Sequence, residues 1–245
     1  MNAFLMQCKA EIKRLLRNRY YVGSSLLMPI LFYTIFTRVV NTDAPNMKEW
    51  QAHYLMSMAA FSVMGSGIMT LGIRTVQERT QGWSLFMLVT PLPGSLYFLA
   101  KMVAQSVIHA LSITVIFCAG ALINGVTMPV HIWLLSGLWI LFASFTFMAL
   151  GTLIGTMKRV DTAIGVSNLL YMGMAVTGGL WMPFDILPSL MQQIGRWLPS
   201  YSFANGAWQL AAQKYPDLSN LFLLAAYAVL FVILSSYIRK KQEAA

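Results

Sequence analysis

Six long apolar blocks, separated by short polar connections, constrain the fold of this chain more than any other feature. A helix that crosses a bilayer needs about 20 apolar residues. Only 10% of the 245 residues are charged, against about 25% in soluble domains, so the charges are too few to cover a soluble globule. We therefore expect an all-α integral membrane protein with six transmembrane helices. The expected spans are residues 22–40, 54–73, 102–124, 132–156, 162–182 and 219–238.

The positions of lysine and arginine predict which ends face the cytoplasm, because cytoplasmic segments carry an excess of these residues. An even number of spans places both termini on one side. That side then holds most of the 17 basic residues and the whole net charge of +9. The other side keeps Arg38, Lys48, Arg196 and Lys214, matched by Asp43, Glu49, Asp185 and Asp217. We expect both termini in the cytoplasm, with the basic charge facing anionic lipid and not nucleic acid.

The segment 1–21, before the first span, has the pattern of an amphipathic helix. The apolar residues at helical spacing are Phe4, Leu5, Cys8, Ile12, Leu15 and Leu16, and the cations on other faces are Lys9, Lys13, Arg14 and Arg17. A helix of this kind lies in the plane of the lipid headgroups. Two interpretations stay open: a simple topology anchor, or an elbow helix that sets the angle of the first span and contacts a cytoplasmic partner.

Prolines divide the segment 183–218, between the fifth and sixth spans, into pieces too short to cross a bilayer. Pro188 can occupy the first turn of a helix, and Tyr201, Phe203 and Trp208 continue an aromatic pattern. The apolar stripe after Pro188 consists of Leu190, Met191, Ile194, Trp197 and Leu198. We expect short re-entrant or interfacial helices at the outer surface. The alternative, an ordinary external loop, would expose several aromatic side chains to water.

Polar residues inside the spans are candidates for a substrate path. Lys101, Gln105 and His109 follow a four-residue spacing and share one face of the third span. Buried polar groups in membranes mark substrate pathways or form hydrogen bonds between helices. The fifth span is rich in glycine, serine, threonine and methionine, which suits a helix that packs on other helices or lines a pathway better than one that faces lipid alone. The candidate path residues are His109, Asn168, Met172 and Trp181.

Catalytic motifs are missing from the sequence. It has no H-E-x-x-H metal motif, no G-x-S-x-G nucleophile elbow and no G-x-x-x-x-G-K-[ST] phosphate loop. We therefore expect no enzymatic activity, no bound metal and no cofactor on this chain. A transporter built from it would draw on ATP hydrolysed by another polypeptide. The alternative is a proton-coupled carrier, for which His109 is the one titratable candidate, because no carboxylate lies deep in an apolar block.

The charged segment 74–101 interrupts the apolar blocks between the second and third spans. Residues 77–89 can form a short helix with bulky Trp83 and Phe86 on it, and two prolines in 90–94 must end that helix. A short rigid helix with exposed aromatic side chains suits docking in a groove of a partner protein. The alternative is that this part simply re-enters the membrane as the start of the third span.

Two stretches of the sequence are shared with a known family. One is Glu78-Arg79-Thr80-Gln81-Gly82, then the apolar residues 83–89, then Thr90-Pro91-Leu92. The other is Gly178-Gly179-Leu180-Trp181-Met182-Pro183, followed by Leu187-Pro188 and by Leu198-Pro199-Ser200-Tyr201. With these motifs, the six-span layout and the amphipathic start, nearly the whole chain resembles the membrane subunit of a type-2 ATP-binding-cassette (ABC) transporter, the bacterial exporter permease family.

The resemblance implies that residues 78–91 form a coupling helix held by a separate ATPase. The implied docking residues are Glu78, Arg79, Gly82, Trp83, Phe86, Thr90 and Pro91. Many family members carry a glutamate three residues after the glycine, where this chain has Leu85. We therefore expect apolar packing by Trp83 and Phe86 in place of an acidic contact.

The resemblance also implies one transmembrane domain, 1–245, in a bacterial cytoplasmic (inner) membrane. Its expected parts are 1–21 (interfacial helix), 22–73 (first two spans), 74–101 (coupling segment), 102–182 (three spans), 183–218 (external region) and 219–245 (last span and basic tail). Two such permeases, identical or related, would pair with two ATPase copies that bind ATP and Mg²⁺. The expected substrate is hydrophobic or amphiphilic, with drug or antibiotic efflux favoured and lipid or glycan export as an alternative.

Overall fold

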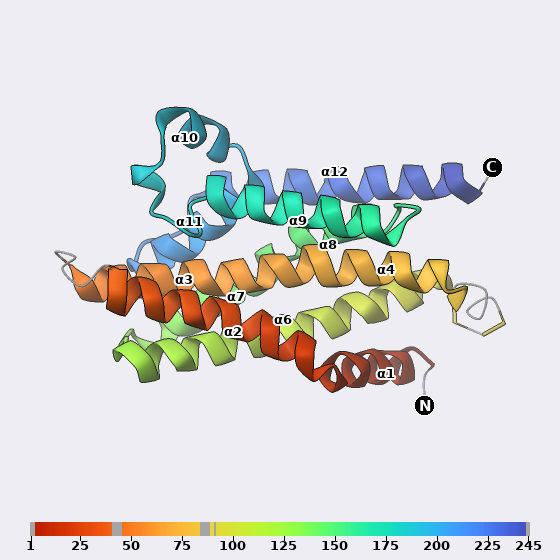
Figure 1. Cartoon of the computed structure of the whole chain (residues 1–245), viewed down its shortest axis with the longest axis horizontal. Helices are drawn as coiled ribbons and strands as arrows, with labels where there is room; N and C mark the ends of the chain where they lie inside the picture. The colour runs from red at the N-terminus through yellow and green to blue at the C-terminus, as the bar shows by residue number, and fades with distance from the viewer. Residues whose placement is uncertain (1–2, 41–45, 84–88, 91, 244–245) are drawn as a thin grey trace.

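The structure, a computed structural model, describes residues 3–40, 46–83, 89–90 and 92–243 of the chain. Every regular element in these ranges is a helix, which confirms the predicted all-α class. Most of the helices run along the long axis of the molecule and pack side by side (Figure 1). This arrangement satisfies the backbone hydrogen bonds inside each segment, as lipid requires.

The N-terminal half contains three helical stretches. The amphipathic helix α1 (Ala3–Arg17) is followed by α2 (Arg19–Ile35), which continues into the π-helical turn η1 (Phe36–Val40). The helices α3 (Met47–Gly65) and α4 (Leu71–Thr80) flank the π-helical turn η2 (Ser66–Thr70). Together these last three form one continuous helix, Met47–Thr80.

The C-terminal half begins with α6 (Gly94–Asn124), which starts directly after Pro93 and ends at Gly125. Gly125 has φ of +62°, a left-handed conformation that favours glycine. The remaining elements are α7 (Val130–Ala143), α8 (Phe145–Ile154), α9 (Val160–Thr177), the 3₁₀ turn η3 (Phe184–Ile186), α10 (Ser189–Gly195), α11 (Pro199–Ala211) and α12 (Leu218–Glu243).

All six predicted apolar blocks are helical, but not all meet the length and hydropathy of a membrane span. Within the described residues, four helices do: Met47–Thr80, Gly94–Asn124, Val130–Ile154 and Leu218–Gln242. Ser25–Val40 is a shorter apolar helix, and α9 has 18 residues. The chain is thus a helical membrane protein, and the count of six spans stays a prediction.

The helix α3 occupies the centre of the packing, whereas α12 lies at its edge. Nearly every side chain from Tyr54 to Met64 is excluded from the surface, and α12 presents most of its apolar side chains outward. Outward-facing apolar side chains on a 26-residue helix suit contact with lipid. Lipid would therefore cover the apolar side chains of α12, as the neighbouring helices cover those of α3.

Glycines allow α8 to approach the second span closely. A Cβ built on Gly151 would lie 2.3 Å from the carbonyl oxygen of Gly67, and one on Gly155 would lie 2.9 Å from the side chain of Thr75. Both glycines therefore sit at this contact. Larger residues would force the two helices apart.

The described ends of the chain lie at one end of the molecule. The start of α1, the end of α4 and the end of α12 share that end, and the start of α3 lies at the opposite end (Figure 1). The arrangement of both termini on one side of a membrane stays a prediction. The assignment of that side to the cytoplasm stays a prediction from the charge pattern.

Candidate functional site

The end of α4 carries the first residues of the expected coupling segment. Glu78 and Arg79 lie in the last turn of α4, and the helix ends at Gln81 and Gly82, where φ is +76°. The prediction that a separate helix starts at residue 77 is wrong, because the helix of the second span continues through Thr80. The left-handed conformation of Gly82 accounts for the break.

The other predicted docking residues are only partly described. The indole of Trp83 is 43% exposed, and Thr90 is exposed as well. Phe86, Pro91 and Leu85 lie outside the described residues. A contact of these residues with an ATPase stays a prediction.

Glu78 is the centre of a buried ionic cluster. Its Oε2 lies 2.5 Å from Lys101 Nζ and accepts a hydrogen bond of 3.0 Å from the Tyr97 hydroxyl. Its Oε1 accepts one of 2.8 Å from Arg14 Nη1. Burying an ionised carboxylate costs several kcal/mol unless it is paired in this way. The Glu78 carboxylate is therefore engaged within the chain, and its surface role as a docking residue has no support in this geometry.

Glu11 supplies the second carboxylate of this cluster. Its Oε2 lies 3.0 Å from Arg74 Nη2, and its Oε1 lies 3.3 Å from Lys101 Nζ and 3.2 Å from the Gln7 amide nitrogen. Lys101 thus bridges Glu11 and Glu78. The cluster of Glu11, Arg14, Arg74, Glu78 and Lys101, called the basal ion cluster below, joins α1, α4 and α6.

Arg79 connects the same turn of α4 to the C-terminal half. One guanidinium nitrogen donates to the carbonyl oxygen of Met157, in the connection between α8 and α9, and the other lies 3.4 Å from Oε1 of Gln242, near the end of α12. Gln242 also donates to the carbonyl of Thr156 at 2.9 Å. A displacement of the end of α4 would therefore also displace α1, α6, α12 and the α8–α9 connection.

A buried polar string crosses the middle of the bundle. Gln105 Nε2 donates to Ser66 Oγ at 2.5 Å and lies 3.1 Å from His109 Nε2, and His109 Nδ1 lies 3.0 Å from Ser144 Oγ. The Ser144 hydroxyl donates its own hydrogen bond to the carbonyl oxygen of Leu141. His109 Nδ1–H must therefore donate to Ser144, and the unprotonated Nε2 accepts from Gln105.

This string gives His109 a structural role. The ring is fully buried, with 0% exposure, and both nitrogens are bound inside the chain. Its partners are Gln105 on the same helix and Ser144, and the string ends at Ser66 in η2 and at Ser144 between α7 and α8, two places where the regular helix is interrupted. The geometry favours hydrogen bonding between helices over the predicted contact of His109 with substrate.

Two of the other path candidates line an apolar groove. This groove, of about 470 Å³, lies between α2, α3, η2 and α9, and Met172 and Trp181 are on its wall with Phe32, Phe61 and Tyr171. The Trp181 ring lies 5.6 Å from Phe32 and 5.8 Å from Phe61, centroid to centroid. Asn168 belongs to the same helix as Met172 and is partly buried, and it is not on this wall.

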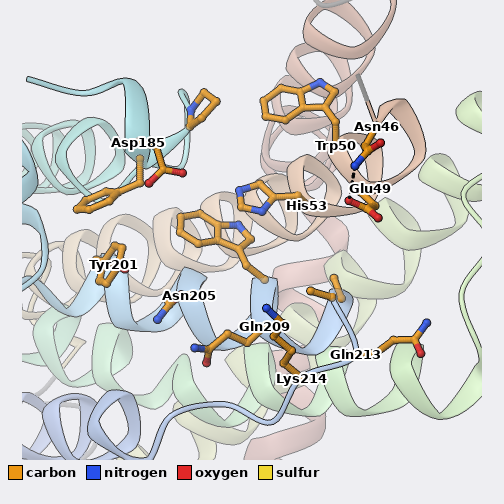
Figure 2. Close-up of a pocket in the computed structure, with 15 residues that line it drawn as sticks. Asn46, Glu49, Trp50, His53, Asp185, Tyr201, Asn205, Gln209, Gln213 and Lys214 are labelled. Carbon is orange, nitrogen blue, oxygen red and sulfur yellow. Dashed lines mark hydrogen bonds between the residues drawn. The ribbon is translucent and has the colours of Figure 1, made fainter. Parts of the chain in front are cut away.

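The end of the molecule opposite the basal ion cluster holds a larger polar cleft of about 960 Å³. Figure 2 shows Asn46, Glu49 and Trp50 of the α3 end on one side and Asn205, Gln209 and Lys214 of the α11 side on the other, with His53 between them. The imidazole of His53 stacks on the Trp208 indole at 4.5 Å. Burial raises the pKa of the nearby Tyr201 hydroxyl, which keeps it neutral.

The segment 183–218 contains the short helices η3, α10 and α11, and their expected re-entrant or interfacial placement at the outer surface stays a prediction. The helix α11 is packed into the bundle: Trp208 Nε1 donates to Ser57 Oγ at 2.8 Å, and Phe203 is fully buried. An ordinary loop is therefore excluded for this part. The apolar side chains of α10, including Leu190 and Ile194, are exposed, as on a helix that lies at a membrane surface.

Sequence reasoning missed several members of the site. It identified Arg14 only as a surface cation, and it gave no role to Glu11, Tyr97 or Trp50. One signal was available for Glu11, which is the single acidic residue in an otherwise basic amphipathic segment. Among the residues that the structure describes, no group of three or more His, Cys, Asp or Glu could hold a metal ion.

Two comparisons with known proteins bear on this arrangement. The family model described as "ABC-2 family transporter protein" matches residues 25–237. A protein of Bacillus subtilis (strain 168) named "Putative transport permease YvfS" is 58% identical over 244 residues, a match that covers 100% of both chains. The second match includes the amphipathic segment and the basal ion cluster as well as the apolar blocks.

Proposed function

Because this chain belongs to the ABC-2 family of transporter proteins, whose permeases work with ATPase subunits, we propose that it is the membrane subunit of an ABC exporter. In this proposal it moves a hydrophobic or amphiphilic substrate out of a bacterial cell across the inner membrane. ATP and Mg²⁺ bind to the separate ATPase, and this chain does no chemistry of its own.

The observation that carries the proposal is the linkage at the end of α4. Segment 78–91 begins in the last turn of α4, which ends the second span, and Glu78 is tied to α1 by an ion pair of 2.8 Å and to α6 by one of 2.5 Å. Arg79 ties the same turn to the α8–α9 connection and to α12. An ATPase that binds Trp83 and its neighbours would therefore displace α1, α6, α12 and the α8–α9 connection together. This displacement is how ATP hydrolysis would change the membrane part.

The substrate class follows from the lining of the apolar groove. Its wall combines aromatic rings with methionines, whose flexible side chains adapt to varied apolar ligands. Only a few polar groups, such as Ser62 and Thr70, face it. This lining supports a drug-like, antibiotic or lipid-like substrate that contacts Met172 and Trp181.

Two copies of the permease and two of the ATPase would form the working transporter, with the substrate passing between the permeases. The polar cleft of Figure 2 lies at the end opposite the ATPase side and would be its outward opening. A proton-coupled carrier, the competing proposal, would need a group that exchanges protons with solvent. His109 does not suit it, because its ring is enclosed and both nitrogens are engaged.

The proposal is tested by reconstituting the chain with a candidate P-loop ATPase in vesicles. We expect the two proteins to co-purify and to export an apolar dye only with ATP. The variant Trp83→Asp should abolish both co-purification and export. The control Trp197→Asp also changes an exposed indole, but one at the far end of the molecule, and it should leave both intact. Equal behaviour of the two variants would refute docking at Trp83.

A cysteine-accessibility experiment tests the orientation separately. Gln81 is exposed at the end of α4, and we expect Gln81→Cys in whole cells to react with a membrane-impermeant maleimide only after the membrane is opened. Lys214→Cys, an exposed position on the cleft side, should react without opening. The reverse pattern would invert the proposed topology.

A further inference from the structure

A cavity of about 340 Å³ lies between α1 and the second span, next to the basal ion cluster. Arg14, Arg74 and Gln77 give it a polar, cationic wall, and Leu15, Met69 and Ile73 give it an apolar one. Its position at the amphipathic helix places it at the depth of lipid headgroups. A cavity with one cationic wall and one apolar wall matches a ligand that is anionic at one end and apolar at the other.

The charges around this cavity do not balance. The basal ion cluster contains three cations and two carboxylates, and both carboxylates and Lys101 are buried. The positive excess therefore falls on the two guanidinium groups that face the cavity, where the Arg14 side chain is 49% exposed. In these ion pairs each guanidinium uses one terminal nitrogen, and an arginine has five N–H donors in a planar fork that suits a phosphate.

The cavity adjoins the apolar groove. Met69 and Thr70 of η2 line both of them. From the two arginines, a ligand can thus extend along η2 toward Met28, Phe32 and Phe61, with no further charged side chain on its way. The combined surface is therefore complementary to a lipid, because the cationic site can bind an anionic headgroup and the apolar groove beside it can hold an acyl chain.

We infer that this combined surface binds a membrane lipid with an anionic phosphate headgroup. Its phosphate would sit against Arg14 and Arg74, and an acyl chain would run past Met69 into the groove. Because the same guanidinium groups pair with Glu78 and Glu11, the bound phosphate would complete the charge balance of the cluster and hold α1 against α4. Lipid binding is independent of ATP and of any ATPase, so it can succeed or fail apart from the proposed transport.

The test measures lipid retention by the purified chain in nanodiscs with native mass spectrometry. Palmitoyl-oleoyl phosphatidylglycerol should be retained, and the phosphatidylcholine of equal chain length should be retained about tenfold less, since its headgroup carries no net charge. Arg14→Gln should lower phosphatidylglycerol retention about tenfold, the order expected for one charge-assisted hydrogen bond. Arg159→Gln removes the same charge from an exposed arginine and should have no effect.

A second variant guards against loss of folding in the first. Gln77→Glu keeps every ion pair of the basal ion cluster and adds a negative charge to the cavity wall, so it should also expel phosphatidylglycerol. Unchanged retention in both variants would overturn the inference. Retention of glycerol phosphate or inorganic phosphate equal to that of the lipid would also overturn it, because it would indicate a soluble anion at this site. A change of oligomeric state without lipid loss would overturn it as well, because it would indicate a second copy of the chain at this surface.

Discussion

The Lys101 ammonium lies 2.5 Å from Oε2 of Glu78, so the two sides of the polar interruption between the second and third spans are joined inside the molecule. Glu78 is in the last turn of α4 and Lys101 is in the second turn of α6. A charge-assisted contact this short holds the two helices in a defined relation at the base of the bundle.

The first prediction concerns this pair. Replacing Lys101 by methionine leaves the carboxylates of Glu78 and Glu11 without their shared buried cation, and removing one partner of a buried ion pair costs about 3–5 kcal/mol. We expect a large drop in the thermal unfolding temperature of the detergent-solubilised chain. Arg159→Met, which breaks an exposed pair with Asp161 at 3.8 Å, is the control and should change little. A Lys101→Met protein as stable as wild type would show that the cluster contributes nothing.

The second prediction concerns the close approach of α8. Gly151→Ala would place its Cβ 2.3 Å from the backbone oxygen of Gly67, and such overpacking costs about 1–3 kcal/mol. Gly165→Ala in α9 meets nothing within 4 Å and should be neutral or slightly stabilising, because alanine favours a helix. The comparison is made by thermal unfolding of the two variants, and similar behaviour would contradict the packing described.

The third prediction concerns the polar string. Ser144→Ala removes the acceptor of His109 Nδ1–H, and a buried donor left without a partner costs about 1–3 kcal/mol. Ser106→Ala, also on a span, removes only a bond to the carbonyl of its own helix at Met102 and should be nearly silent. Thermal unfolding measures both, and a silent Ser144→Ala would argue against the Nδ1–H tautomer of His109.

The fourth prediction concerns the apolar groove. Met172→Trp should fill part of the 470 Å³ space and reduce ATP-driven export several-fold, while the ATPase still co-purifies. Leu169→Trp on the same helix is the matched control, since Leu169 is 75% exposed and absent from the groove wall. Equal export by the two variants, measured with the same dye in vesicles, would remove the groove from the substrate path.

Particular residues show where sequence reasoning reached the structure. The four-residue spacing of the small residues Gly151 and Gly155 permits close helix contact, and both lie at such a contact. Met172 and Trp181 were expected to share a path, and they line one groove. Each of these expectations rested on a local property, namely the size or apolar character of a side chain on a helix.

Other residues show where predictions from the sequence did not agree with the structure. Glu78 belongs to a recognisable motif, yet the motif does not reveal that the carboxylate turns inward to Lys101 and Arg14. The start expected for a separate helix at residue 77 failed for a related reason. No residue in 74–80 interrupts helical hydrogen bonding, so the second span continues until Gly82 adopts its left-handed conformation.

The sequence by itself determined that this protein is a helical membrane protein, because long apolar blocks with few charges satisfy their backbone hydrogen bonds as helices in lipid. It also determined the family, through motifs that are continuous in the chain. Only the tertiary structure decided which charges meet. Glu11, Glu78 and Lys101 are far apart in sequence, and ion pairing acts across a few ångströms of space, so the packing of α1 against α4 and α6 had to be known before the cluster could be seen.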